Sequence, residues 1–178
     1  MTRVLDRERA ALVVVDVQEA FRPAVGEWEA VTANVAILVQ GARALGLPIH
    51  VTEQYPRGLG ETVPEVAAHL DGIEPLEKTA FSAVRAEGFD LDGRDQALVC
   101  GIEAHVCVNQ TVADLLEGGV QAHVAADAVT SRTALNRRLG LEKMEGSGAV
   151  LTSTEMALFE LVGAAGSDEF KTIQKLIR

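Results

Sequence analysis

The sequence predicts an α/β protein: a doubly wound parallel sheet with helices packed on both of its faces. Two observations support this fold class. Strand-like runs such as residues 11–15 and 97–100 are continuously apolar, which is typical of parallel strands buried on both faces. These runs alternate with segments of helical periodicity, as in parallel α/β folds. The length of 178 residues suits a single domain spanning residues 1–178, and no linker-like segment divides it.

Each element is assigned from its own periodicity and its end signals. Residues 29–45 place apolar side chains on one helical face and are followed by Gly46, a common helix terminator. Residues 54–62 contain Gly and Pro and are predicted to form a loop. The predicted strands are residues 11–15, 48–52, 76–77, 97–100, 121–126 and 149–151. The predicted helices are residues 29–45, 63–70, a segment after Cys107, residues 132–145, and two segments opened by a capping box at residues 152–155 and by Ser167.

Connectivity rules place these strands in a definite order. Right-handed crossovers and double winding predict a three-layer α/β/α sandwich with the Rossmann-like strand order 3-2-1-4-5-6. In this order the first strand lies beside the fourth, and the chain reverses direction between them. Asp16 ends the first strand, and the segment containing Cys107 follows the fourth. We therefore expect these two side chains to meet at the carboxyl edge of the sheet, where open α/β sheets bind ligands.

The composition limits the classes of partner and compartment. The chain has 16 Lys and Arg residues against 26 Asp and Glu residues, and this net charge of −10 argues against nucleic acid and anionic membranes as partners. No apolar run is long enough to span a bilayer, and no leader segment is recognisable. The 2 cysteines do not form a disulfide framework, so the expected compartment is the cytoplasm. We expect a small molecule as the partner.

Cys107 is the leading candidate for a nucleophile. It lies between the apolar run at residues 97–100 and the start of a predicted helix. The unpaired N–H groups at a helix start carry partial positive charge, so we expect them to lower the thiol pKa and to hold an oxyanion. The oxyanion donors would be the N–H of Cys107 and one from the preceding turn. Cys100 lies inside the apolar strand and is expected to be a core residue.

Two charged residues supply the other groups that thiol chemistry needs. Asp16 can accept the thiol proton, and Lys78, at the end of the short third strand, can stabilise the thiolate and the transition state. Neither residue alone indicates a catalytic site, because an aspartate often caps a strand end and a lone lysine is usually solvated. A lone cysteine is often a small buried hydrophobe. The functional interpretation depends on all three residues occurring at strand ends of one predicted sheet.

Three spaced motifs resemble the isochorismatase-like cysteine hydrolases. They read ALVVVDVQEAF at residues 11–21, EKTAFSA at residues 77–83 and GIEAHVCVNQT at residues 101–111. The likeness runs from about residue 9 to the C-terminus, in the same order. It implies an Asp–Lys–Cys triad, which maps onto Asp16, Lys78 and Cys107.

The resemblance also implies an activity and further features of the site. It implies a six-stranded sheet, a homo-oligomer of two or more copies, and a cis peptide bond between Ile102 and Glu103. That bond would aim the Glu103 N–H at the oxyanion, beside the N–H of Cys107. The implied activity is hydrolysis of a C–N bond in a small amide-like molecule through an acyl-enzyme on Cys107, without a cofactor.

The chain departs from relatives that use a metal. Nicotinamidases carry an Asp-x-His metal motif after the second strand, whereas residues 52–57 read TEQYPR here. No cluster of His and carboxylate residues has ligand spacing elsewhere, so we expect no metal. Isochorismatases proper lack the cysteine that this chain keeps, so the family name does not define the substrate. A catalytically idle scaffold that binds a metabolite or a protein partner is the alternative function.

Several residues are candidates for contact with a substrate. The resemblance suggests that some of them support or line the pocket, and others lie on loops at the same edge of the sheet. For Phe21 a core role is the alternative, and for His105, in the cysteine turn, the alternative is a structural role of its ring. Arg132 is interpreted as an inter-subunit salt-bridge residue rather than an anion site. The substrate-binding candidates are Gln18, Phe21, Gln54, Tyr55, Phe81 and His105.

Overall fold

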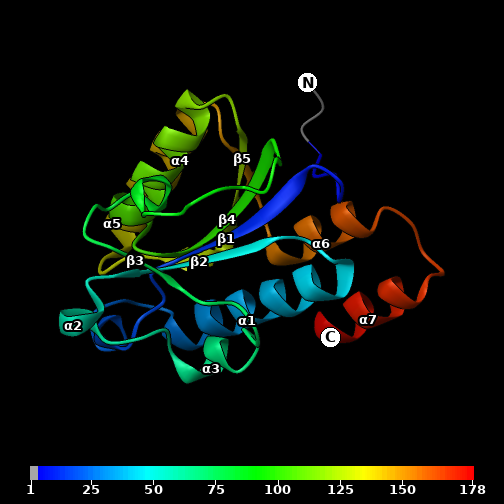
Figure 1. Cartoon of the computed structure of the whole chain (residues 1–178), viewed down its shortest axis with the longest axis horizontal. Helices are drawn as coiled ribbons and strands as arrows, with labels where there is room; N and C mark the ends of the chain where they lie inside the picture. Colours follow the sequence, from blue (N-terminus) through cyan, green and yellow to red (C-terminus); the bar gives the residue numbers. More distant parts are fainter. Residues whose placement is uncertain (1–3) are drawn as a thin grey trace.

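The strands form one six-stranded, all-parallel sheet in the order β3-β2-β1-β4-β5-β6, which confirms the predicted topology. This computed structural model describes residues 4–178. Helices cover both faces of the sheet, so the chain has three layers (Figure 1). The strands are β1 (Ala10–Val15), β2 (Ile49–Gln54), β3 (Leu76–Lys78), β4 (Gln96–Ile102), β5 (Gln121–Thr130) and β6 (Val150–Thr152).

The long helix α1 packs with α3, α6 and α7 on one face of the sheet, whereas α4 and α5 cover the other face (Figure 1). The short helix α2 directly follows β2, at the carboxyl edge of the sheet. No helix within residues 4–178 combines the length and the apolar character needed to cross a membrane. The helices are α1 (Trp28–Leu45), α2 (Pro56–Leu59), α3 (Pro64–Ala67), α4 (Asn109–Glu117), α5 (Ala134–Gly146), α6 (Thr154–Val162) and α7 (Asp168–Leu176).

The observed elements differ from the predicted ones mainly at their ends. β5 continues to Thr130 because its last residues pair with the end of β4, beyond an irregularity in the register. The predicted loop at residues 54–62 contains α2, which has a proline at its start, where the missing N–H costs nothing. The predicted helix at residues 63–70 is shorter, because only Pro64–Ala67 is helical and the chain then leaves through overlapping turns.

The two C-terminal helices are capped by serine side chains. Ser153, rather than Thr152, caps α6, and its hydroxyl accepts a hydrogen bond from the N–H of Met156. The predicted capping box is therefore wrong by one residue. Ser167 caps α7 as predicted, by accepting a hydrogen bond from the N–H of Phe170.

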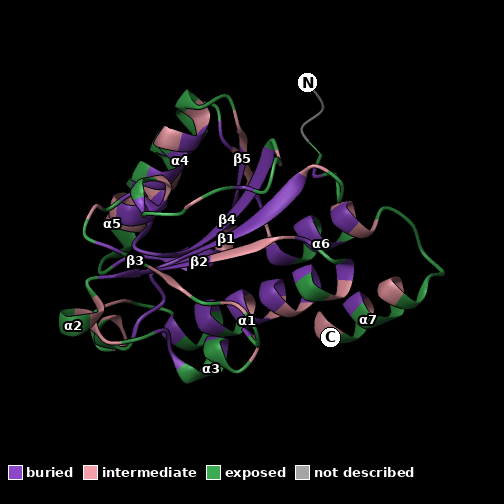
Figure 2. Cartoon of the chain, viewed as in Figure 1, coloured by how far each residue is buried: buried purple, intermediate pink, exposed green. Residues whose placement is uncertain are grey.

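The core consists of two apolar layers, one on each face of the sheet. All six residues of β1 are buried (Figure 2). Alternate residues of this strand belong to opposite layers. Cys100, in β4, belongs to the layer beneath α1, and Cys107 belongs to the layer beneath α4. The two thiols are free and lie on opposite sides of the sheet.

His123 makes the unfolding free energy of the fold depend on pH. Its ring in β5 is fully buried, and within residues 4–178 neither ring nitrogen has a hydrogen-bond partner. Burial lowers the pKa of His123 to about 4. The unfolded chain takes up the proton near pH 6.5, so stability decreases as the pH falls from that value towards 4. We expect this residue to cost about 2 kcal/mol of unfolding free energy between pH 7.5 and pH 5.

The substitution His123→Leu tests this expectation by urea unfolding at pH 7.5 and pH 5. The variant should lose about 2 kcal/mol less than the native chain over this range. Val124→Ala, at a buried apolar position in the same strand, is the control and should lower stability equally at both pH values. An unchanged pH dependence in His123→Leu would contradict the assignment of this loss to His123.

Candidate active site

Cys107 lies in a π-helical turn, Ala104–Val108, which joins β4 to α4 and is called the Cys107 turn below. The α-helix itself begins at Asn109, so Cys107 precedes the observed helix start by two residues, whereas the sequence predicted a helix that starts at Cys107. The Glu103 carbonyl accepts a hydrogen bond from the N–H of Val108, at 3.2 Å, which closes the turn. Cys107 is 4% exposed.

The Cys107 turn is held between two helices. A Cβ atom at Gly140 of α5 would lie 2.8 Å from the carbonyl carbon of Ala104 and 2.9 Å from the nitrogen of His105. Only glycine therefore lets α5 approach the backbone of the turn this closely. On the other side, the Thr111 hydroxyl of α4 donates a hydrogen bond to the Cys107 carbonyl at 2.7 Å.

Asp16 lies directly after β1 and is fully buried. Its Oδ2 accepts a hydrogen bond from Lys78 Nζ at 2.6 Å, and its Oδ1 accepts one from the Thr52 hydroxyl at 2.8 Å. The Asp16 carboxylate also lies close enough to the Cys107 thiol to raise its pKa. The carboxyl ends of β1, β3 and β4 thus place Asp16, Lys78 and Cys107 at one edge of the sheet; the strand order had predicted this for Asp16 and Cys107.

The Lys78 ammonium group uses all of its protons inside the protein. Besides Asp16, Nζ donates to Gln54 Oε1 and to the Phe81 carbonyl, at 2.9 Å each. An ammonium group has three donors, so none is left for another ligand. Lys78 therefore orients Asp16 and supplies positive charge near the thiol.

Burial dominates the protonation of the site. It raises the pKa of the Cys107 thiol to about 12, and the Asp16 carboxylate adds to this effect while Lys78 opposes it. The expectation that the helix start lowers this pKa is therefore wrong, because desolvation of the thiolate is the larger effect. Burial also raises the pKa of Asp16, against the attraction of Lys78. The resting thiol is protonated and lies beside the carboxylate of Asp16, whose pKa is raised.

The peptide bond between Ile102 and Glu103 is cis, as the family resemblance implied. The Glu103 backbone lowers the pKa of the Cys107 thiol, against the larger effect of burial. This backbone therefore lies close to the thiol.

Cys107 opens onto a cavity of about 560 Å³. Four of the predicted substrate-binding residues line this cavity, and these are Phe21, Gln54, Phe81 and His105. The His105 ring is also tied to the protein, since its Nδ1 lies 3.1 Å from the Ser131 hydroxyl oxygen. The remaining lining residues are Leu59, Glu103, Val106, Arg132 and Asn136.

Gln18 supports the site from beneath and does not line this cavity. Its side chain is fully buried: Oε1 accepts from the Gln54 N–H at 2.8 Å, and Nε2 donates to the carbonyls of Gln54 and Gly60. The prediction that Gln18 contacts the substrate is therefore wrong, whereas its predicted supporting role agrees with these contacts. Gln18 fixes the end of β2 to the segment that contains α2.

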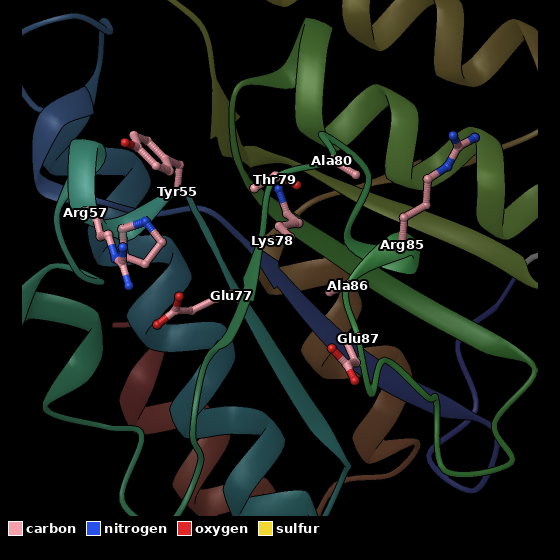
Figure 3. A pocket seen from close by; sticks show the side chains of 10 residues that line it. Tyr55, Arg57, Glu77, Lys78, Thr79, Ala80, Arg85, Ala86 and Glu87 are labelled. Atoms are coloured by element: carbon pink, nitrogen blue, oxygen red, sulfur yellow. The ribbon is translucent and has the colours of Figure 1, made fainter.

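Tyr55 lines a different cavity of about 490 Å³, which corrects its predicted place (Figure 3). In this cavity Tyr55 and Arg57 lie on one side, Arg85 and Glu87 on the other, and the segment around Lys78 between them (Figure 3). The Tyr55 ring is largely exposed and folds over Gly58. Its left-handed backbone, with φ of 39°, turns it away from β2.

Arg132 forms an ion pair within the chain, at the mouth of the Cys107 cavity. Its Nη2 lies 2.6 Å from Glu103 Oε1, and its backbone N–H donates to Glu103 Oε2 at 2.9 Å. The structure thus gives Arg132 a partner within the chain, Glu103, in the loop that follows β4. Its role between subunits stays a prediction. Burial favours the neutral form of Glu103, but its hydrogen bonds to Arg132 prevail and hold the pKa of Glu103 below its usual value.

Sequence reasoning missed several residues of the site. Thr52, which holds Asp16, pairs with Val15 in the β1–β2 register, so its place beside the strand end could have been inferred from strand pairing. Leu59 and Asn136 reach the cavity from α2 and α5, and no pattern in the sequence marks them. Within residues 4–178, no group of three or more His, Cys, Asp or Glu residues is arranged to hold a metal ion.

Comparisons with known proteins agree with this architecture. The isochorismatase domain family matches residues 10–156. Isochorismatase domain-containing protein 2A of Mus musculus is 44% identical over 174 residues, which cover 96% of this chain and 84% of that protein.

Two solved structures superpose closely on the chain. The MAR1 ribonuclease of Caenorhabditis elegans has a TM-score of 0.92 and 38% identity, with 98% of this chain and 92% of that chain covered. The Escherichia coli YcaC gene product, described as an octameric hydrolase of unknown specificity, has a TM-score of 0.91 and 24% identity, with 99% and 91% covered. The family match and the mouse relative together show that the chain belongs to the isochorismatase-domain family.

Proposed function

We propose that the chain is a cofactor-free cysteine hydrolase that cleaves a C–N bond of a small amide-like molecule. The observation that carries this proposal is the convergence of the Cys107 thiol, the Asp16 carboxylate and the Lys78 ammonium group beside one cavity. The thiol is the nucleophile, the carboxylate its base, and the ammonium group the cation that holds the carboxylate in place.

The first half of the reaction forms an acyl-enzyme. The Cys107 thiol proton moves to Asp16 while the sulfur bonds to the carbonyl carbon, and the C=O electron pair moves to the oxygen. The N–H groups of Glu103 and Cys107 stabilise that oxyanion. When the C=O bond re-forms, the C–N bond breaks, and the departing amine takes the proton from the carboxyl group of Asp16. The raised pKa of Asp16 suits it to hold this proton between the two steps.

The second half returns the enzyme to its resting state. Asp16 accepts a proton from a water molecule as the water oxygen attacks the thioester carbon. The tetrahedral intermediate then collapses, the C–S bond breaks, and the sulfur regains its proton from the carboxyl group of Asp16. Lys78 keeps its three hydrogen bonds throughout and takes no part in the proton transfers. The products are a carboxylic acid and an amine or ammonia.

Alkylation tests the assignment of the nucleophile. We expect iodoacetamide at pH 7.5 to modify Cys107 at least about tenfold faster than Cys100, because Cys107 opens onto a cavity and Cys100 is sealed in the core. Peptide mapping by mass spectrometry over time gives both rates. The variants Cys107→Ala and Cys100→Ala are matched controls, and only the first should abolish rapid labelling. Equal or reversed labelling would count against the proposal.

Turnover tests the reaction itself. Small amides, carbamoyl compounds and ureides are screened for release of ammonia, with Cys107→Ala as the blank. A substrate that is cleaved equally by this variant would refute catalysis by the thiol. Binding of a compound without any turnover would favour the scaffold function. RNA belongs in the panel because one similar structure is named a ribonuclease, and RNA cleavage that requires Cys107 would contradict the amide substrate class.

We also propose that the chain is a single domain and a homo-oligomer in the cytoplasm, with neither nucleic acid nor membrane as a partner. The net charge of −10 supports the exclusion of nucleic acid and of membranes as partners. The free thiols support a reducing compartment. One protein of the same fold, the YcaC gene product, is described as an octamer, which supports assembly of this chain.

A further inference from the structure

We propose that the buried Glu103 carboxylate neutralises Arg132 and thereby makes the Cys107 cavity selective for uncharged substrates. Glu103 is then a specificity-determining residue of the site, and the substrate class narrows to small uncharged amides with an apolar acyl or amine substituent. This inference rests on the proposed role of Cys107 as the nucleophile.

Among residues 4–178, Arg132 supplies the one guanidinium group that lines the cavity, and the ion pair occupies it. Arg132 binds Glu103 through both Nε and Nη2, and the Glu103 side chain is only 4% exposed, against 59% for Arg132. A guanidinium group held in this bidentate way has its charge balanced at short range. The cavity thus contains an arginine that is not available as a free anion site.

The other charges of the site are balanced in the same way. Asp16 and Lys78 form the other ion pair, at 2.6 Å, and both of its side chains are buried. Each pair contributes one negative and one positive charge, so the two pairs together add no net charge. The whole chain carries −10, which disfavours the approach of an anion.

The rest of the lining is suited to apolar groups. Phe21, Leu59, Phe81 and Val106 present aromatic and aliphatic side chains to the cavity. The amides of Gln54 and Asn136 can orient a polar group without charge. A substrate carboxylate would lose water in this cavity without gaining a free cation, which is unfavourable.

Iodoacetamide and iodoacetate test this selectivity, because they share a leaving group and nearly the same shape but differ in charge. The rate constants for modification of Cys107 are measured at pH 7.5 and each is divided by the rate of the same reagent with N-acetylcysteine. We expect the native chain to favour iodoacetamide on this normalised scale. Glu103→Gln leaves Arg132 unbalanced and should lower the preference roughly fivefold, through faster reaction with iodoacetate.

Two further variants complete the series. Arg132→Gln leaves Glu103 unbalanced and should raise the preference for iodoacetamide roughly fivefold. The double variant Glu103→Gln/Arg132→Gln restores neutrality and should return the preference to within about twofold of the native chain. This control also separates charge from any damage to the Cys107 turn, because damage would persist in the double variant.

The outcomes separate this inference from the proposed function. A preference that stays within twofold in both single variants, while Cys107 is still labelled far faster than Cys100, would overturn the role of Glu103 and leave the nucleophile in place. A preference for iodoacetate in the native chain would also overturn it. Loss of selective labelling of Cys107 in the native chain would overturn both proposals.

Discussion

Replacement of Lys78 by methionine is expected to lower the free energy of unfolding by about 3 kcal/mol at pH 7.5. The change leaves the Asp16 carboxylate buried without the ammonium group that lies 2.6 Å away. Methionine keeps an unbranched side chain of similar length, so the loss is mainly electrostatic. Urea unfolding monitored by circular dichroism measures it.

The double variant Asp16→Asn/Lys78→Met is the control for this loss. It removes both charges and should recover at least about half of the lost stability, because no unpaired charge stays buried. Without Lys78 the folded-state pKa of Asp16 rises further, and a raised carboxyl pKa means that stability decreases as the pH rises through it. The cost of Lys78→Met should therefore be smaller at pH 5 than at pH 8. Additive losses in the double variant would contradict a buried ion pair.

Replacement of Gly101 by alanine is expected to cost about 4 kcal/mol of unfolding free energy. Gly101 pairs with Val15 where β4 runs beside β1, and a Cβ there would overlap the Val15 carbonyl oxygen and lie 2.7 Å from its nitrogen. These are backbone atoms, which cannot move aside as a flexible side chain can. The Gly101 φ of 120° is also unfavourable for alanine. Chemical unfolding of the variant measures the loss.

Gly148→Ala is the matched control for Gly101→Ala. Gly148 has a similar φ, 107°, but a Cβ there would meet nothing within 4 Å. We expect this variant to lose only about 1 kcal/mol, from backbone strain alone. The difference between the two variants isolates the close approach of β4 to β1. Equal losses would show that conformational strain, and not contact with Val15, explains the effect.

The strand order was predictable from the sequence for a definite physical reason. Strands buried on both faces are continuously apolar, so the run at residues 11–15 stands out without any help from its neighbours. The C-terminal end of β5 was not predictable in the same way. Asp127 lies inside this strand, and the last residues belong to it only because they pair with β4. The paired residues of β4 and β5 lie far apart in the sequence, so no local sequence pattern marks where β5 ends.

The choice of Asp16, Lys78 and Cys107 as the site was predictable, because all three follow strands whose carboxyl ends converge near a topological switch point. The pKa of Cys107 was not, since the helix-start argument ignores how deeply the fold buries the thiol. The places of Gln18 and Tyr55 depend on how the segment around α2 folds over the edge of the sheet. The pairing of Glu103 with Arg132 joins two loops that follow different strands, and neither residue marks the other in the sequence.

The separation of the two thiols by the sheet has a consequence for oxidation chemistry. The chain contains only 2 cysteines, and they face different layers, so Cys100 cannot close a disulfide with Cys107. An oxidant that converts Cys107 to a sulfenic acid therefore meets no resolving thiol within the same subunit. Reversal of such damage must come from a thiol supplied in solution, and oxidation without that thiol proceeds to the irreversible acids.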